Sequence, residues 1–110
     1  MKKEFLNDFE ELILTLVAAL RENAYGANIT IEIERWLERK ATLSAVHVIL
    51  YRLEDNGYLK SIVGGATNER GGRRKRIYTI TSAGVAVLKA MKETRIDLWK
   101  AVPQLKLTNR

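Results

Sequence analysis

The chain has 110 residues, of which 46% are hydrophobic, and its nineteen lysines and arginines against thirteen acidic residues leave a net charge of +6. This length and hydrophobic content support one domain with its own core, which excludes wholesale disorder, and the absence of cysteine excludes disulfides, thiolate metal sites and cysteine nucleophiles. The positive surplus suits a polyanionic partner, nucleic acid first and an anionic membrane second, although a merely soluble basic protein would carry the same charge.

The first half of the chain is predicted to form three helices. Apolar residues recur at helical spacing in Phe9–Arg21 and cover most sides of that helix, so we expect it to pack on a partner as well as on its own core. A turn is expected at Asn23–Asn28, followed by a second helix over Ile29–Arg39 with Trp36 and Leu37 among its inward residues.

The third helix is expected over Ala45–Asn56, with Ser44 as its N-cap and Gly57 at its C-terminal cap. The apolar period then changes, and the strand formers in Tyr58–Val63 and Arg74–Ile80 predict a hairpin with a long loop.

The last helix is expected to be capped by Thr81 or Ser82 and to stop at Pro103. The resulting order predicts an α+β, mostly helical fold. It is a winged helix-turn-helix of three helices and a two-stranded hairpin, the wing, followed by a C-terminal dimerisation helix. We expect a single domain over residues 1–110, with a DNA-binding core at 9–80 and the dimerisation helix at 81–103.

A homodimer interface is predicted on the first and last helices. The last helix follows part of a coiled-coil heptad, interrupted by Arg95, and the first helix has more apolar surface than one core requires. The residues expected in this interface are Leu12, Leu16, Leu88, Met91, Leu98, Trp99 and Val102.

In a helix-turn-helix protein the third helix enters the major groove of DNA. On this helix Arg52 suits guanine or a phosphate, and Val48 suits a thymine methyl group. An ordinary amphipathic helix with a hydrated polar face is the alternative that the helix alone leaves open. The predicted recognition residues are Ser44, Ala45, His47, Val48, Tyr51 and Arg52.

The loop between the two strands carries five positive charges in seven residues, around two glycines that allow a tight hairpin tip. Such charges neutralise phosphates and give affinity without sequence information, whereas the alternative is a solvated charge run. The predicted wing residues are Arg70, Gly71, Gly72, Arg73, Arg74, Lys75 and Arg76.

The sequence gives little support for a catalytic site, a cofactor or a metal site. Ser44 and His47 are three residues apart but lack a third partner, and His47 is the only histidine of the chain. Residues Met1 to Asp8 are charged and lack the apolar run of a signal peptide, and the longest apolar stretch, Leu12–Leu20, is too short to span a bilayer. We therefore expect a soluble, cytoplasmic protein that is not an enzyme, needs no cofactor and has no membrane role.

Three segments together resemble the PadR family of bacterial transcriptional regulators: Tyr25-Gly26, the run from Ala45 to Leu59 that contains Arg52-Leu53-Glu54, and the run from Glu69 to Gly84. The resemblance covers about Phe9 to Trp99. It implies a winged-helix homodimer that binds pseudo-palindromic promoter DNA, usually as a repressor, with Ser44 to Arg52 as the recognition helix and the final helix as the dimerisation element.

This sequence departs from the family pattern in two ways. His47 stands where the family usually has tyrosine, which puts the usual contact in doubt and raises the alternatives of a substitute contact or pH sensitivity. One helix fits after Thr81, as in the short members of the family, so a dedicated ligand domain is not expected, and a small-molecule effector is left open.

The sequence therefore predicts a sequence-specific regulator of transcription, acting as a homodimer on double-stranded DNA. The rival from another class is a winged-helix module that binds proteins and has no specific DNA role. That rival requires exposed apolar surface outside the dimer interface.

Overall fold

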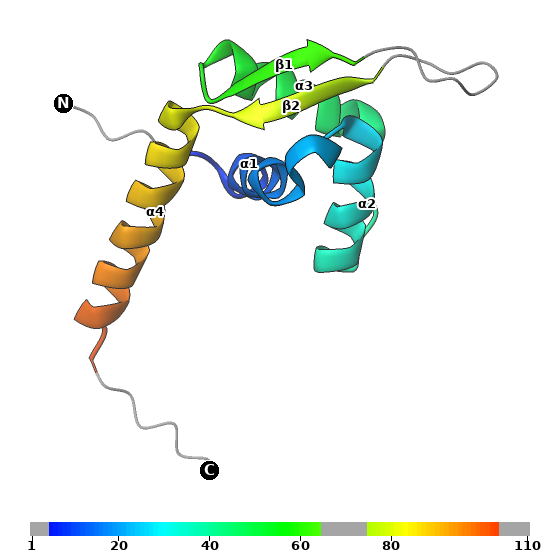
Figure 1. The fold of residues 1–110 in the computed structure, drawn as a ribbon. Helices are drawn as coiled ribbons and strands as arrows, with labels where there is room; N and C mark the ends of the chain where they lie inside the picture. Colours follow the sequence, from blue (N-terminus) through cyan, green and yellow to red (C-terminus); the bar gives the residue numbers. More distant parts are fainter. Residues whose placement is uncertain (1–4, 65–74, 104–110) are drawn as a thin grey trace.

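The computed structural model of the chain describes residues 5–64 and 75–103. Its four helices and two strands follow the predicted order, which confirms the winged-helix arrangement (Figure 1). The elements are α1 (Asp8–Leu20), the 3-10 turn η1 (Arg21–Asn23), α2 (Gly26–Leu37), α3 (Leu43–Asp55), β1 (Leu59–Val63), β2 (Arg76–Ile80) and α4 (Ser82–Ala101).

Polar side chains fix where three helices begin. At α1 the Asn7 side chain accepts a hydrogen bond from the Glu10 backbone N–H at 2.8 Å, and the Glu10 carboxylate accepts one from the Asn7 N–H at 2.9 Å, which is a capping box. Thr81 caps α4 by accepting from the Gly84 N–H, as predicted. The predicted cap of α3 was wrong: Thr42 accepts from the Ala45 N–H, so the helix begins at Leu43 with Ser44 in its first turn.

Gly57 ends α3 as the sequence predicted. Its φ of +85° is in the left-handed region, where glycine has no steric cost. The Gly57 N–H donates to the Glu54 carbonyl at 3.0 Å and the Tyr58 N–H donates to the Leu53 carbonyl at 2.9 Å. This pair of bonds is a Schellman motif, and it directs the chain from α3 straight into β1.

The second helix was predicted over Ile29–Arg39 and spans Gly26–Leu37, so both of its ends differ from the prediction. It begins at Gly26, three residues early, because Tyr25 already has extended backbone angles and acts as the N-cap. The prediction that Trp36 and Leu37 face inward was wrong, since they are 70% and 42% exposed. Ile29 and Ile33 are buried. The last turn of α2 extends beyond α1, so its apolar side chains have no core to pack against, although they follow the helical spacing (Figure 1).

The core lies where α1 passes beneath the hairpin, between α2 and α4 (Figure 1). The strands are antiparallel, with Leu59 opposite Ile80 and Ser61 opposite Tyr78, and the Tyr78 N–H donates to the Ala24 carbonyl at the end of η1. The largest fully buried side chains are Tyr78, Ile13, Leu14, Ile29, Ile33, Leu50, Leu53, Met91, Val17 and Val46.

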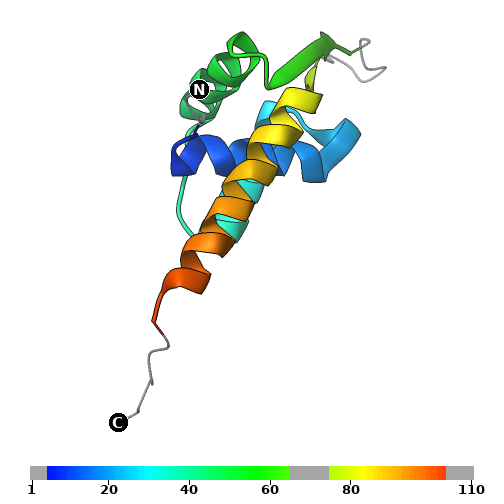
Figure 2. The ribbon, with the colours of Figure 1, turned by 90° about the vertical axis from the view of Figure 1, so that its left-hand side faces the viewer.

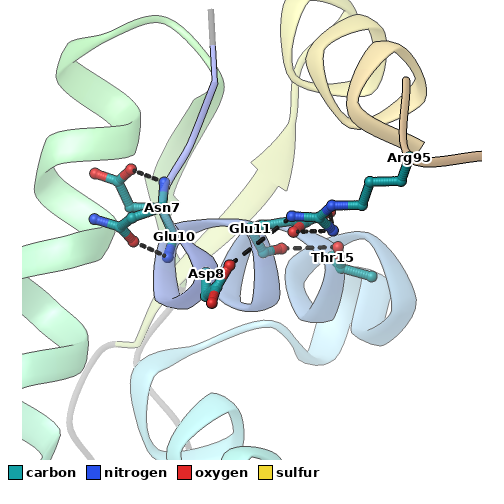
Figure 3. Close-up of polar contacts among 6 residues, drawn as sticks. All are labelled: Asn7, Asp8, Glu10, Glu11, Thr15 and Arg95. Atoms are coloured by element: carbon teal, nitrogen blue, oxygen red, sulfur yellow. Dashed lines mark hydrogen bonds and ion pairs between the residues drawn. The ribbon is translucent and has the colours of Figure 1, made fainter. Parts of the chain in front are cut away.

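The N-terminal half of α4 packs on the core, and its C-terminal end projects away from the rest of the molecule (Figures 1 and 2). Arg95 joins the two helices, since its guanidinium donates to the Glu11 carboxylate of α1 at 2.7 Å and lies 3.8 Å from Asp8 (Figure 3). The arginine that interrupts the predicted heptad therefore has a partner in its own chain. In the described part of the chain, no helix combines the length and apolarity needed to cross a membrane.

Candidate nucleic-acid interface

The outer face of α3 is the surface that a helix-turn-helix would place in the major groove. Four of the six predicted recognition residues, Ser44, Ala45, Val48 and Tyr51, are exposed there. Val48 is 53% exposed and Tyr51 is 57% exposed. Exposing a valine side chain to water is unfavourable, so contact with a partner explains the apolar residues of this face better than hydration does.

Arg52 is exposed but already has a partner. Its guanidinium donates to the Glu10 carboxylate at 3.2 Å, and the Glu10 side chain is only 12% exposed. The other oxygen of Glu10 is the one that completes the capping box at Asn7. The ion pair thus links α3 to α1 across 42 residues of sequence and involves the same guanidinium that the sequence predicted to contact guanine or a phosphate.

His47 lies at the junction of α2 and α3. A Cβ atom built on Gly26 would lie 3.0 Å from the His47 Cε1, so the ring fills the space that glycine leaves. The ring also stacks on Tyr51, with 5.9 Å between centroids. Its Nδ1 is enclosed and has no hydrogen-bond partner among the described residues. The Nε2 of the ring also faces Gly26, at 3.2 Å from the same Cβ position.

The hairpin is joined to α3 by a short chain of hydrogen bonds. The Ser61 hydroxyl of β1 donates to the Glu54 carboxylate of α3 at 2.7 Å, and the Arg76 guanidinium of β2 donates to the Ser61 oxygen at 3.0 Å. On the other side the Lys75 ammonium lies 4.2 Å from the centroid of the Tyr25 ring. The base of the wing is consequently held in a fixed position relative to α3.

Of the seven predicted wing residues, Lys75 and Arg76 are described and exposed, and both have contacts within the chain. Arg70, Gly71, Gly72, Arg73 and Arg74 lie outside the described residues. Tyr78 supports the same strand from within the core, and burial raises the pKa of its phenol above the ordinary value, with Tyr51 and Glu54 adding to the effect.

The predicted dimer interface is exposed in part. Leu98 and Trp99 near the end of α4 are 63% and 74% exposed, and Val102, just after the helix, is 41% exposed. Leu12 and Leu88 are partly buried against the core. Leu16 and Met91 are buried within the single chain, at 6% and 1% exposure, so they belong to its core instead of to a free surface.

An apolar groove of about 820 Å³ runs between α1 and α4 beside these residues. Thr15 and Ala18 line it from α1, and Val85, Ile96 and Trp99 line it from α4. Sequence reasoning missed Ala18 and Ile96, although the three-residue spacing of Ile96 and Trp99 was a usable signal. It also missed Glu10 as a partner of α3, for which the sequence holds no signal beyond the capping-box spacing. Residues 5–64 and 75–103 contain no group of three or more histidines and acidic residues placed to hold a metal ion.

The model of the transcriptional regulator PadR-like family matches residues 13–90 of the chain. No curated protein matches it significantly. Among solved structures, a transcriptional regulator from Clostridium thermocellum is 25% identical with a TM-score of 0.64, covering 89% of this chain and 94% of that protein.

Two further structures share the fold at lower identity. A PadR-like transcriptional regulator from Bacillus cereus is 18% identical with a TM-score of 0.70, covering 92% of this chain and 93% of its own. PadR of Bacillus subtilis, solved in complex with operator DNA, is 22% identical with a TM-score of 0.54, covering 94% of this chain and 53% of its own.

Proposed function

The chain belongs to the PadR-like family of transcriptional regulators, and from this premise we propose that it binds promoter DNA sequence-specifically as a homodimer and represses transcription by excluding polymerase. The observation that carries the proposal is the exposed outer face of α3, fixed beside the wing by the Glu54, Ser61 and Arg76 contacts. An enzymatic role is not proposed, because no described group joins a nucleophile, a base and an orienting partner.

Charge and geometry both support a duplex DNA partner. The net charge of +6 draws the protein to a polyanion, and Arg76, the last residue of the basic run, is linked through Ser61 to Glu54 of α3. The structure of PadR of Bacillus subtilis with operator DNA shows that this fold serves such a partner in a related protein. We propose residues 9–80 as the DNA-binding core.

The homodimer proposal rests on the surface of α1 and α4. The groove between them and the exposed Leu98, Trp99 and Val102 form an apolar surface on an element that projects away from the core. A second copy placed there would bring two α3 helices to one face, which suits half-sites about one helical turn apart, roughly 34–36 Å. We accordingly propose residues 81–103 as the dimerisation helix.

The first test of the function is salt-controlled binding of the purified chain to the DNA upstream of its own gene, against a scrambled duplex of equal length. We expect a preference of at least about 10³-fold at physiological salt, which is the lower end for specific regulators. Equal affinity for the two duplexes would leave a basic protein with no sequence specificity and would contradict the proposal.

The homodimer is tested by comparing two exposed tryptophans. Light scattering of the wild-type chain at micromolar concentration is expected to give twice the chain mass of 12.5 kDa. Trp99→Ala is expected to raise the dimer dissociation constant at least about 30-fold, because a large aromatic side chain at an interface typically contributes about 2 kcal/mol or more. Trp36→Ala removes a similarly exposed tryptophan from α2, so it serves as the control and should leave the dimer intact. A monomeric wild type, or equal effects of both variants, would refute this interface.

A protein-binding role is the second candidate function, and one observation favours it. Ile31 and Trp36 of α2 are 54% and 70% exposed, and neither lines the groove between α1 and α4. A protein-binding role requires exposed apolar side chains outside the proposed dimer interface. It becomes the function to pursue if the binding test shows no preference for the upstream duplex.

A further inference from the structure

Resting on the proposed function, we infer that this protein selects its operator by apolar contact between the α3 residues Val48 and Ala45 and the methyl groups of thymines, and that no arginine of α3 reads guanine. The occupant of the exposed α3 face is thus a stretch of major groove that displays thymine. This assignment follows from the contacts that the α3 side chains make within the chain.

The residue best suited to guanine has its charge satisfied inside the protein. Arg52 would have to leave Glu10 to form a bidentate contact with guanine O6 and N7. Its departure would leave a carboxylate with 12% exposure in place of an ion pair, next to the helix start that the same carboxylate caps. Leaving the largely buried Glu10 carboxylate without its cationic partner is unfavourable, so Arg52 stays on α1 when DNA binds.

The rest of α3 offers few polar groups for bases. Its sequence, LSAVHVILYRLED, contains no asparagine, glutamine or lysine, which are the other side chains that make specific bidentate or charged contacts with purines. His47 packs on Gly26 with its Nδ1 enclosed. Asp55 lies at the C-terminal end and would repel phosphates, so the N-terminal half of the helix is the part that can approach the duplex.

That half carries an apolar strip. Ala45 and Val48 are three residues apart and therefore lie on one face of the helix, and both are exposed. The C5-methyl group of thymine is the apolar group on the base edges of the major groove, and contact with it removes both surfaces from water. Ser44 and Tyr51 flank the strip with hydroxyls that suit phosphates or base edges.

The test begins with a duplex selected by the wild-type protein from a random-sequence library. Each thymine of the selected duplex is then replaced in turn by deoxyuridine, which lacks only the methyl group. We expect about fourfold weaker binding at each contacted thymine, the loss that corresponds to one buried methyl or methylene group. The Val48→Ala protein should bind the thymine duplex more weakly and lose most of its preference over the deoxyuridine duplex at the position facing Val48.

Two controls make the result specific. Ile31→Ala truncates an equally exposed residue on α2 and should keep the full deoxyuridine effect. Replacing guanines by 7-deazaguanine, which lacks the N7 acceptor, should leave affinity unchanged at positions facing α3. The inference is overturned if no deoxyuridine weakens binding, if Val48→Ala keeps the wild-type deoxyuridine effect, or if a 7-deazaguanine effect disappears in Arg52→Ala. Failure of the library to yield any preferred duplex would instead refute the proposed function itself.

Discussion

Replacing Arg73 and Arg74 together by alanine is expected to weaken binding to every DNA sequence by a factor on the order of 10²–10³ at physiological salt. These residues belong to a run of five positive charges in seven residues, in the segment that joins β1 to β2. Each phosphate that is no longer neutralised should reduce the magnitude of the slope of log K against log salt by about 0.9, or roughly 3.6 for the four arginines of a homodimer. The measurement is a salt titration of binding to the upstream duplex and to a scrambled duplex.

Comparing the affinities for the two duplexes distinguishes a loss of charge contacts from a loss of base recognition. Because phosphate contacts carry no sequence information, the variant should lose affinity for both duplexes by similar factors and keep its preference. Arg39→Ala with Lys40→Ala is a matched control, since it removes the same charge just past the end of α2 that points away from the hairpin (Figure 1). If the salt slope of the wing variant stays at the wild-type value, or if both variants reduce it equally, the assignment of the wing to the DNA backbone is wrong.

Replacing Gly84 by alanine is expected to lower the free energy of unfolding by about 2 kcal/mol, within the usual range for overpacking a core. A Cβ atom at this position would overlap the Tyr58 carbonyl oxygen and would lie 2.6 Å from the Ile80 Cγ1. Gly84 is buried in the first turn of α4, where Thr81 caps the helix, and neither the cap nor the strand can move away easily. The start of α4 would have to shift away from the hairpin.

Thermal unfolding followed by circular dichroism measures this effect, and a decrease of roughly 8–16 °C in the melting temperature corresponds to the expected loss. Ser82→Ala, at an exposed position in the same turn, is the control and should change the stability by less than about 0.5 kcal/mol. Alanine is intrinsically the better helix former, so a Gly84→Ala variant more stable than the wild type would mean that the close approach of α4 to the hairpin is not maintained in solution.

Local patterns in the sequence determined the order of elements and most of their boundaries. Helical spacing placed α1 and α3 within two residues of their observed starts, and Gly57 and Thr81 marked a helix end and a helix start because caps depend on residues three or four apart. The same local reasoning failed at α2, which begins at Gly26 inside the predicted turn, with Tyr25 as its N-cap and with Gly26 packed on His47, a residue 21 positions away.

The candidate site was likewise predictable from the sequence only in part. The exposed face of α3 and the apolar end of α4 were predictable, since periodicity reveals which residues share a face. Only the tertiary structure decided what covers each face: Glu10 of α1 pairs with Arg52, Leu16 and Met91 are buried by their own chain, and Trp36 lies beyond the core. Periodicity is a property of one helix, whereas the partner of a charge and the burial of an apolar side chain depend on segments that only folding brings together.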